Sequence, residues 1–367
     1  MLKVALKRYR TLVLFSIFFF YLGCCLTLSF LRIDCTKVTV SNNNVLQLQD
    51  DTIILAEYIV LIVSSPSNQA KRDAVRATWS KFVNNIFIDN GQTIYKWNYS
   101  WTTQNSQHGM IKIYFAVGTQ GLNDEKIKSL RAEQKHSKDL LFLNIEDNYQ
   151  NLSLKNLKAI KWFSKNVKGM KYLIKCDDDS FVRIDLIVKD LEAFAPSMTA
   201  PEINQFVTLK NRIPSDKGLY WGYFNGHANV YLNGKWQERT WFLCDKYLPY
   251  ALGGGYVISR SIVDYIANNS NLLSYYNSED VSMGVWTAAL DINRVHDIRF
   301  DTEWKSRGCN KTMLVRHKQS PSDMFEMYET LVHSHGEKLC KTEDFKRKTY
   351  FYNWNVLPSM CCSSTQN

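Results

Sequence analysis

Four apolar runs rich in β-branched and aromatic residues alternate with three segments of helical periodicity in the first half of the chain. The runs are EYIVLIVSS (57–65), GMIKIYFAVG (109–118), DLLFLNI (139–145) and KYLIK (171–175), and the helical segments cover residues 68–79, 124–138 and 152–166. This alternation is typical of βαβ units with a mainly parallel, buried sheet. We therefore expect an α/β fold that binds its ligands beyond the carboxyl ends of the strands.

After Pro196 the sequence changes to short pieces rich in glycine and aromatic residues, such as GLYWGYFNG (218–226) and LPYALGGGYVIS (248–259). We expect hairpins and loops packed against the first half. Trp221, Trp236 and Trp241 are candidates for stacking on sugar rings, and each is equally well explained as a core residue. The three glycines at 253–255 allow close approach of the backbone to a ligand but lack the spacing of a nucleotide-binding loop.

The N-terminus predicts a membrane anchor. Four basic residues within 1–10 precede an uncharged run at 11–31, which is long enough to cross a hydrocarbon core of about 30 Å. A cleaved signal peptide would have a shorter apolar region that ends at small residues. The charge bias favours a cytosolic tail at 1–10, a transmembrane signal-anchor at 11–31, a polar stem at 32–52 and a lumenal domain at 53–367.

Further sequence features agree with the secretory pathway. Four N-x-[ST] sequons occur, at Asn98, Asn151, Asn268 and Asn310. Seven of the nine cysteines follow the anchor, so at least one is unpaired within the chain, and we expect Cys176 to be a buried free thiol. The net charge of +10 is dispersed, which argues against nucleic-acid binding and is explained by a solvated surface or by an anionic substrate such as a nucleotide diphosphate.

Three consecutive carboxylates, Asp177, Asp178 and Asp179, directly follow the fourth apolar run. Such a cluster is costly unless a cation compensates it. Carboxylate oxygens suit Mg²⁺ or Mn²⁺, which usually complete their coordination with water and substrate phosphates. The pattern therefore favours a divalent cation that carries a diphosphate.

The acidic triad is also compatible with a calcium-binding loop, a phosphatase motif or a solvated acidic turn. A calcium-binding loop would need a third ligand where Phe181 stands. A D-x-D phosphatase would use Asp177 as its nucleophile, but it normally carries the motif on its first strand, and three strands precede it here. A solvated acidic turn would have no ligand at all.

Glu279 and Asp280, in NSEDVSMGVW (277–286), are candidates for the general base that group transfer to a hydroxyl requires. A carboxylate at a helix N-terminus stays ionised and oriented. The same residues are equally consistent with an ordinary helix start capped by Ser278.

Basic residues follow the first strand in KRDAVRATW (71–79). Arg72 and Arg76 are spaced to share one helical face, where they would clamp phosphates or form an exposed cationic surface. His317, in LVRHKQS (314–320), is a lone late histidine. Such a residue is usually structural unless the fold returns it to the metal.

Taken in order, these segments resemble the lumenal β1,3-glycosyltransferases, a family that includes β1,3-galactosyltransferases, β1,3-N-acetylglucosaminyltransferases and Fringe. The resemblance is carried by KRDAVRATW, YFAVG, EDNYQNLSLKN, KCDDDSF, YLPYALGGGYVIS and SEDVSMG, which together span residues 71–284. It implies a GT-A-type α/β fold, that is, a Rossmann-like mixed sheet flanked by helices.

The resemblance also implies roles for particular residues. The metal ligands would be Asp179, Asp177 and His317, and Asp280 would be the catalytic base with Glu279 beside it. The donor-binding residues would be Arg72, Arg76, Lys155, Asp177 and Asp178, and the acceptor-binding residues would be Tyr247, Asp245, Trp241, Gly254 and Gly255.

The second half is most similar to the branch of the family that builds the glycosaminoglycan linkage region, on WFLCDKYLPYALGGGYVIS, HDIRFDTEWKSRGC, HKQS and the late CC pair. That similarity implies a Golgi type II membrane enzyme that uses Mn²⁺ or another divalent cation. It would move galactose from UDP-galactose to the 3-hydroxyl of the galactose in Gal-β1,4-Xyl on proteoglycan core proteins. A β1,3-transferase for glycoprotein or glycolipid acceptors and a non-catalytic carbohydrate-binding relative are the alternatives.

Overall fold

The computed structural model describes residues 15–16, 18–22, 53–89, 92–95, 110–194 and 217–362. The chain divides into two compact units, Met1–Val45 and Leu46–Asn367. In the first unit, residues 15–16 and 18–22 are helical, and among the described residues there is no helix with the length and apolar character needed to cross a membrane. The expected tail (1–10), stem (32–52) and most of the expected anchor (11–31) lie outside the described residues.

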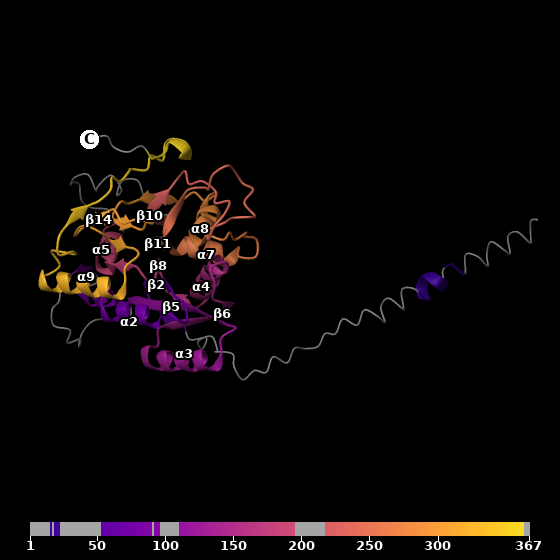
Figure 1. The fold of residues 1–367 in the computed structure, drawn as a ribbon, viewed down its shortest axis with the longest axis horizontal. Helices are drawn as coiled ribbons and strands as arrows, with labels where there is room; N and C mark the ends of the chain where they lie inside the picture. The colour runs from indigo at the N-terminus through magenta and orange to yellow at the C-terminus, as the bar shows by residue number, and fades with distance from the viewer. Residues whose placement is uncertain are drawn as a thin grey trace, which may run out of the picture. The chain divides into compact units, whose positions relative to one another are not determined.

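A seven-stranded mixed sheet runs through the second unit (Figure 1), in the order β12-β10-β11-β8-β2-β5-β6. The four strands from the first half are parallel to one another, and β11 is antiparallel to both β8 and β10. The strands are β2 (Tyr58–Val63), β5 (Ile111–Gln120), β6 (Leu140–Glu146), β8 (Tyr172–Asp177), β10 (Leu219–Asn225), β11 (Tyr250–Ser259) and β12 (Asn293–His296).

Seven helices of the described second unit accompany this sheet. They are α2 (Gln69–Ala77), α3 (Asp124–Ser137), α4 (Leu152–Asn166), α5 (Ile184–Phe194), α7 (Arg260–Asn268), α8 (Glu279–Thr287) and α9 (Pro321–His333). The predicted alternation of four strands and three helices is confirmed. After Pro196, β10 and β11 pair antiparallel, as in the expected hairpins, and β11 pairs with β8, so that both strands extend the same sheet.

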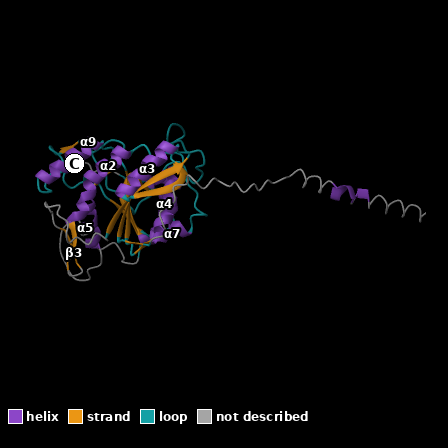
Figure 2. Cartoon of the chain, turned by 90° about the horizontal axis from the view of Figure 1, so that it is seen from below, coloured by secondary structure: helices purple, strands orange, loops and turns teal. Residues whose placement is uncertain are grey.

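The apolar side chains of the described residues form two large cores, one on each face of the sheet, and a small third cluster that includes Tyr247 and Tyr250. Every residue of β2 is buried, and its side chains alternate between the cores: Tyr58, Val60 and Ile62 enter one, and Ile59 and Leu61 enter the other. Helices α2, α3, α5 and α9 contribute to the first core, and α4, α7 and α8 contribute to the second. Figure 2 shows α2 and α5 on one side of the strands and α4 and α7 on the other.

Short strands complete the described fold and close its loops. Three pairs are formed by β1 (Ile54–Leu55) with β7 (Val167–Lys168), β3 (Ile86–Asp89) with β4 (Gln92–Tyr95), and β14 (Gly308–Cys309) with β16 (Asp344–Phe345). A three-stranded sheet has β15 (Val315–Arg316) in the middle, between β13 (Phe300–Asp301) and β9 (Phe181–Val182). The 3-10 helix η1 (Trp79–Asn85) follows α2. A second 3-10 helix, η2 (Pro358–Met360), precedes the C-terminal cysteines.

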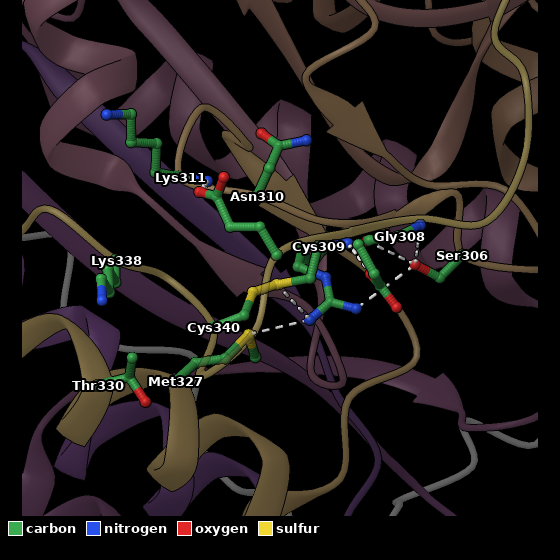
Figure 3. The surroundings of a disulfide bond; sticks show 12 residues. Ser306, Gly308, Cys309, Asn310, Lys311, Met327, Thr330, Lys338 and Cys340 are labelled. Carbon is green, nitrogen blue, oxygen red and sulfur yellow. Dashed lines mark hydrogen bonds between the residues drawn. A yellow bond between two sulfur atoms is a disulfide. The ribbon is translucent and has the colours of Figure 1, made fainter.

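Two disulfides are formed within the described chain. One joins Cys309 to Cys340 and ties β14 to the segment after α9 (Figure 3), and the other joins the adjacent Cys361 and Cys362. Cys176 is a buried free thiol, as expected, and Cys244 is free and exposed.

Candidate active site

The acidic triad lies at the carboxyl end of β8, where the chain turns toward β9. Asp177 is the last residue of β8, and Asp178 and Asp179 lie in the turn that follows it, which brings Asp177 and Asp179 to the same histidine. The His317 Nε2 atom lies 3.3 Å from Asp177 Oδ2 and 3.0 Å from Asp179 Oδ1. Asp178 instead accepts hydrogen bonds from Ser64 (2.8 Å) and Asn68 (2.7 Å). The triad therefore serves two different sets of partners.

His317 reaches the triad because β15 pairs with β9. Arg316 is the register partner of Phe181, and the Gln319 amide donates to the Asp179 carbonyl at 2.8 Å. A β-carbon added at Gly254 would meet the His317 ring at 2.5 Å, so the glycine leaves room for the imidazole. The Cys309–Cys340 disulfide (Figure 3) restrains the strand segment that leads to His317. Residues far apart in sequence are thus placed in contact by local pairing.

The cluster of Asp177, Asp179 and His317 fits a divalent cation. One ligand atom from each residue lies within 4.8 Å of the others. The His317 Nε2 atom and Asp179 Oδ1 are buried and face each other at 3.0 Å, and the buried His317 Nδ1 atom lacks a hydrogen-bond partner among the described residues. Two carboxylate oxygens and one imidazole nitrogen are a donor set that suits Mn²⁺. Burial lowers the pKa of His317 and the two carboxylates raise it to about 9, so a bound cation would displace a proton.

A buried lysine connects this cluster to the second acidic pair. The Lys175 Nζ atom lies 2.9 Å from Asp177 Oδ1, 3.0 Å from Glu279 Oε2 and 2.6 Å from the Gly253 carbonyl oxygen. Burial alone would lower the pKa of Lys175, but the two carboxylates raise it well above its usual value. Lys175 is therefore an internal cation that joins β8, β11 and α8.

Glu279 and Asp280 differ in what surrounds them. Glu279 is buried, and its carboxylate accepts hydrogen bonds from Asn156 and Tyr256 in addition to the Lys175 ion pair. Asp280 is partly exposed and accepts from the Gly253 amide at 3.0 Å and from the Val281 amide at 2.9 Å. Burial and the charge of Glu279 raise the pKa of Asp280 to about 6. Of this pair, Asp280 is the one able to take a proton from a bound molecule near neutral pH.

A cavity of about 500 Å³ contains both ends of the site. Asp177 and His317 contribute to its lining together with Asp280. Its aromatic wall includes Trp236 and Trp304, whose ring centroids are 6.0 Å apart in an edge-to-face arrangement. The volume lies in the range of small-molecule sites. The cavity can therefore hold a ligand between the candidate cation site and the candidate base.

The three basic residues predicted at the donor site are paired internally. Arg72 is fully buried and forms a bidentate pair with Glu133, which also binds Arg76. Lys155 is almost fully buried against Asp147. Their side chains are not among those that line the cavity.

A neighbouring lysine faces the triad instead. Lys71 is one-third exposed and lies 3.2 Å from Asp178 and 3.6 Å from Asp179. Lys318 lies 3.6 Å from Asp179. These two cations are better placed than the arginines to meet an anionic ligand. The i,i+4 spacing of Arg72 and Arg76 predicted a shared face but not that this face would turn toward Glu133 on α3.

Of the predicted acceptor residues, Gly254 lines the cavity. The Tyr247 hydroxyl is buried and accepts from the Tyr231 amide, and Trp241 donates to the Cys244 carbonyl and packs on Tyr247. Asp245 is exposed, and a β-carbon at Gly255 would meet Val315 at 2.9 Å. Tyr247 and Trp241 therefore pack next to the residues that line the cavity and do not line it themselves.

Sequence reasoning did not assign a site role to Tyr231, Lys235 or Trp304, which line the cavity. Trp236, a sugar-stacking candidate, also lines it, whereas Trp221 is a core residue. The signal for Trp304 was weak, because it lies far downstream of the aromatic-rich segment.

Three of the four sequons lie in the described residues, and Asn98 lies outside them. Asn268 is exposed at the end of α7, and Asn151 is partly exposed before α4. Asn310 is buried, and its amide oxygen accepts from the amide and hydroxyl of Thr312. Asn268 is therefore the most accessible of the three, and use of these sequons stays a prediction.

Comparison with known proteins assigns the family. A family model described as galactosyltransferase matches residues 96–298, more than half of the chain. The mouse (Mus musculus) protein beta-1,3-galactosyltransferase 6 is 40% identical over 306 residues, which cover 83% of this chain and 81% of the relative. This chain belongs to the galactosyltransferase family.

More distant relatives match a shorter part. UDP-GalNAc:beta-1,3-N-acetylgalactosaminyltransferase 2 of Xenopus laevis is 32% identical over 54% of this chain and 36% of its own length. Hydroxyproline O-galactosyltransferase GALT2 of Arabidopsis thaliana is 30% identical over 55% of this chain and 27% of its own length. Among solved structures, an active-site mutant of LgtC aligns over 66% of this chain and 74% of its own, with 12% identity and a TM-score of 0.27, which is too low to support an inference.

The position of Arg72 gives a test of its role. We expect Arg72→Ala to lower the free energy of unfolding by about 3–5 kcal/mol, because Glu133 would stay buried after losing one of its two arginine partners. Urea denaturation would measure this, and Arg131→Ala on the exposed side of α3 is the matched control. Unchanged stability together with lost UDP affinity would instead support direct contact with the donor.

Proposed function

We propose that this protein is an inverting β1,3-galactosyltransferase of the GT-A type, with UDP-galactose as its donor. One observation carries the proposal: Asp177 and His317 of the cation-ligand cluster line the same cavity as the accessible carboxylate of Asp280. Transfer of a sugar from a nucleotide needs both, since the departing diphosphate must be stabilised and the acceptor hydroxyl must lose a proton.

At the donor end, Asp177, Asp179 and His317 would hold the divalent cation, for which we propose Mn²⁺. When bound, this ion would supply positive charge to the diphosphate of the donor. Lys71 and Lys318 add positive charge next to Asp179. Arg72 and Arg76 position α2 against α3 and so support the donor end indirectly.

At the acceptor end, Asp280 takes the proton of the attacking hydroxyl. Two backbone amides orient its carboxylate, and its raised pKa makes it a stronger base than an ordinary aspartate. Glu279 stays bound to Lys175 and acts as a positioning residue. Attack on the face opposite the leaving group converts an α-linked donor into a β-linked product.

For the acceptor, we propose the 3-hydroxyl of galactose in Gal-β1,4-Xyl on proteoglycan core proteins. The similarity to the linkage-region branch supports this choice, as does the identity of 40% with a protein named as a β1,3-galactosyltransferase. Other acceptors and N-acetylated donors are the rival within the family, given the similarity to an N-acetylgalactosaminyltransferase. A non-catalytic carbohydrate-binding relative is the rival from another class.

The same similarity supports a Golgi membrane location with a lumenal catalytic domain. The expected anchor at 11–31 and the disulfide between Cys309 and Cys340 fit an oxidising lumenal compartment. The partners would then be galactosylated, xylosylated core proteins at that membrane.

A radiolabelled UDP-sugar assay tests the proposal. We expect galactose transfer to a Gal-Xyl acceptor that depends on Mn²⁺ and disappears in chelator. Preferred transfer to simple β-galactosides, or preferred use of UDP-N-acetylgalactosamine, would favour the rival transferases. No transfer with any donor, combined with retained sugar binding, would favour a non-catalytic role.

The division of labour between the two ends predicts different defects. Asp280→Asn keeps an oxygen for the Gly253 amide, so we expect transfer to fall by about 100- to 10,000-fold with UDP affinity retained. We expect Asp179→Ala to lose the Mn²⁺-dependent part of UDP affinity as well. Calorimetric titration of UDP with and without Mn²⁺ distinguishes the variants, and equal UDP affinity in both variants and the wild type would contradict this division.

The pKa of Asp280 predicts the acid limb of the pH profile. Because the base must be ionised, we expect kcat/KM to be constant above its pKa, to halve near pH 6 and to fall about tenfold per pH unit below it. UDP binding measured over the same range separates protonation of the cation ligands from protonation of the base. A rate that stays flat down to about pH 5 would contradict the role of Asp280.

A further inference from the structure

A second cavity of about 510 Å³ adjoins the first on the side of Asp280. Tyr149 and Lys235 line both cavities, and the Lys235 ammonium lies 4.6 Å from the centre of the Tyr149 ring. Asn277 lines the second cavity and Ser278 lines the first, so the two meet just before Glu279 and Asp280. No residue of the cation cluster lines the second cavity. It therefore continues the acceptor end of the site.

The charged groups that line this second cavity are Lys235, Glu238 and Arg239. Glu238 is buried: one carboxylate oxygen accepts from the Thr240 amide and hydroxyl, and the other accepts from the Asn277 amide at 2.7 Å. The carboxylate of Glu238 therefore stabilises the local backbone through these hydrogen bonds.

The two cations have no such partner. Lys235 and Arg239 are exposed, and neither forms an ion pair with a carboxylate in the described part of the chain. Within the described residues, Arg239 donates only to the Gln237 side-chain oxygen, at 3.3 and 3.4 Å. The accessible charge of this cavity is therefore positive.

The two cavities differ in the ligand that they suit. The first has the aromatic pair Trp236 and Trp304, which suits the face of a sugar ring. The second has no tryptophan in its lining, which includes the tyrosines Tyr149, Tyr275 and Tyr276 and the polar or cationic groups of Gln150, Gln237, Thr240 and Arg239. Amide and hydroxyl groups of this kind suit a peptide backbone, and a guanidinium suits a carboxylate.

We infer that the second cavity binds the peptide that carries the acceptor sugar, and that Arg239 recognises a carboxylate side chain on that peptide. This inference rests on the proposed transferase function and extends it from the reacting sugar to the polypeptide beyond it. Arg239 is then a specificity-determining residue that lies outside the catalytic cavity. The protein would prefer acidic glycopeptides over neutral ones.

Three acceptors test this inference on the full-length protein in detergent. They are a Gal-Xyl-serine peptide with glutamate and aspartate beside the serine, the same peptide with glutamine and asparagine, and benzyl Gal-Xyl without a peptide. For the wild type we expect KM for the acidic peptide to be about two- to fivefold lower than for the neutral one, the range for an exposed ion pair. The preference should shrink in high salt.

Arg239→Glu should remove or reverse this preference and leave kcat and KM for benzyl Gal-Xyl unchanged, which also shows that the variant folds. Arg131→Glu, an equal charge change on exposed α3, should keep the preference. The inference would be overturned by a wild type that does not discriminate between the peptides, or by an Arg239→Glu variant that keeps the full preference. In either case, transfer to benzyl Gal-Xyl would still uphold the proposed function. Absence of transfer to all three acceptors would overturn both.

Discussion

The buried ammonium group of Lys175 is the interaction on which the site depends. It lies in β8 two residues before the acidic triad and bridges Asp177, Glu279 and the Gly253 carbonyl. A lone ammonium at this depth would be strongly unfavourable, and two unpaired carboxylates beside it would be as well. Together they form a compensated cluster, in which removal of one member costs about 3–5 kcal/mol. The cluster fixes the distance between the proposed cation ligands and the helix that carries Asp280.

Close packing of backbone and side chain completes this arrangement. Gly254 and Gly255 let β11 lie directly against His317 and Val315, where any β-carbon would collide. The Gly253 amide and carbonyl then bind Asp280 and Lys175 from the same strand. The triple glycine is therefore explained by approach of the histidine segment and by hydrogen bonding to the acidic pair. The sequence expectation was close approach of this backbone to a ligand, whereas the groups that approach Gly254 and Gly255 in the structure belong to the protein.

Much of the fold could be predicted because local patterns determine it. The helix expected at 152–166 is α4 with the same bounds, and the triad follows the fourth parallel strand, as the βαβ pattern required. The positions of Arg72 and Lys155 could not be predicted, since helical spacing identifies a shared face but not its neighbour. Lys175 was hidden within an apolar run, and Trp304, which lines the cavity, follows β13, a strand that pairs with the β15 strand ahead of His317. These contacts depend on tertiary packing between distant segments.

Asp177, Asp179 and His317 are proposed to hold a cation beside the donor diphosphate, next to the cavity that Asp280 lines. The most direct measurement is a crystal structure of the protein with Mn²⁺ and UDP, in which anomalous scattering locates the manganese. We expect a single strong peak within coordinating distance of these three side chains and of the UDP phosphates. Manganese bound elsewhere, or UDP bound outside this cavity, would contradict the claim.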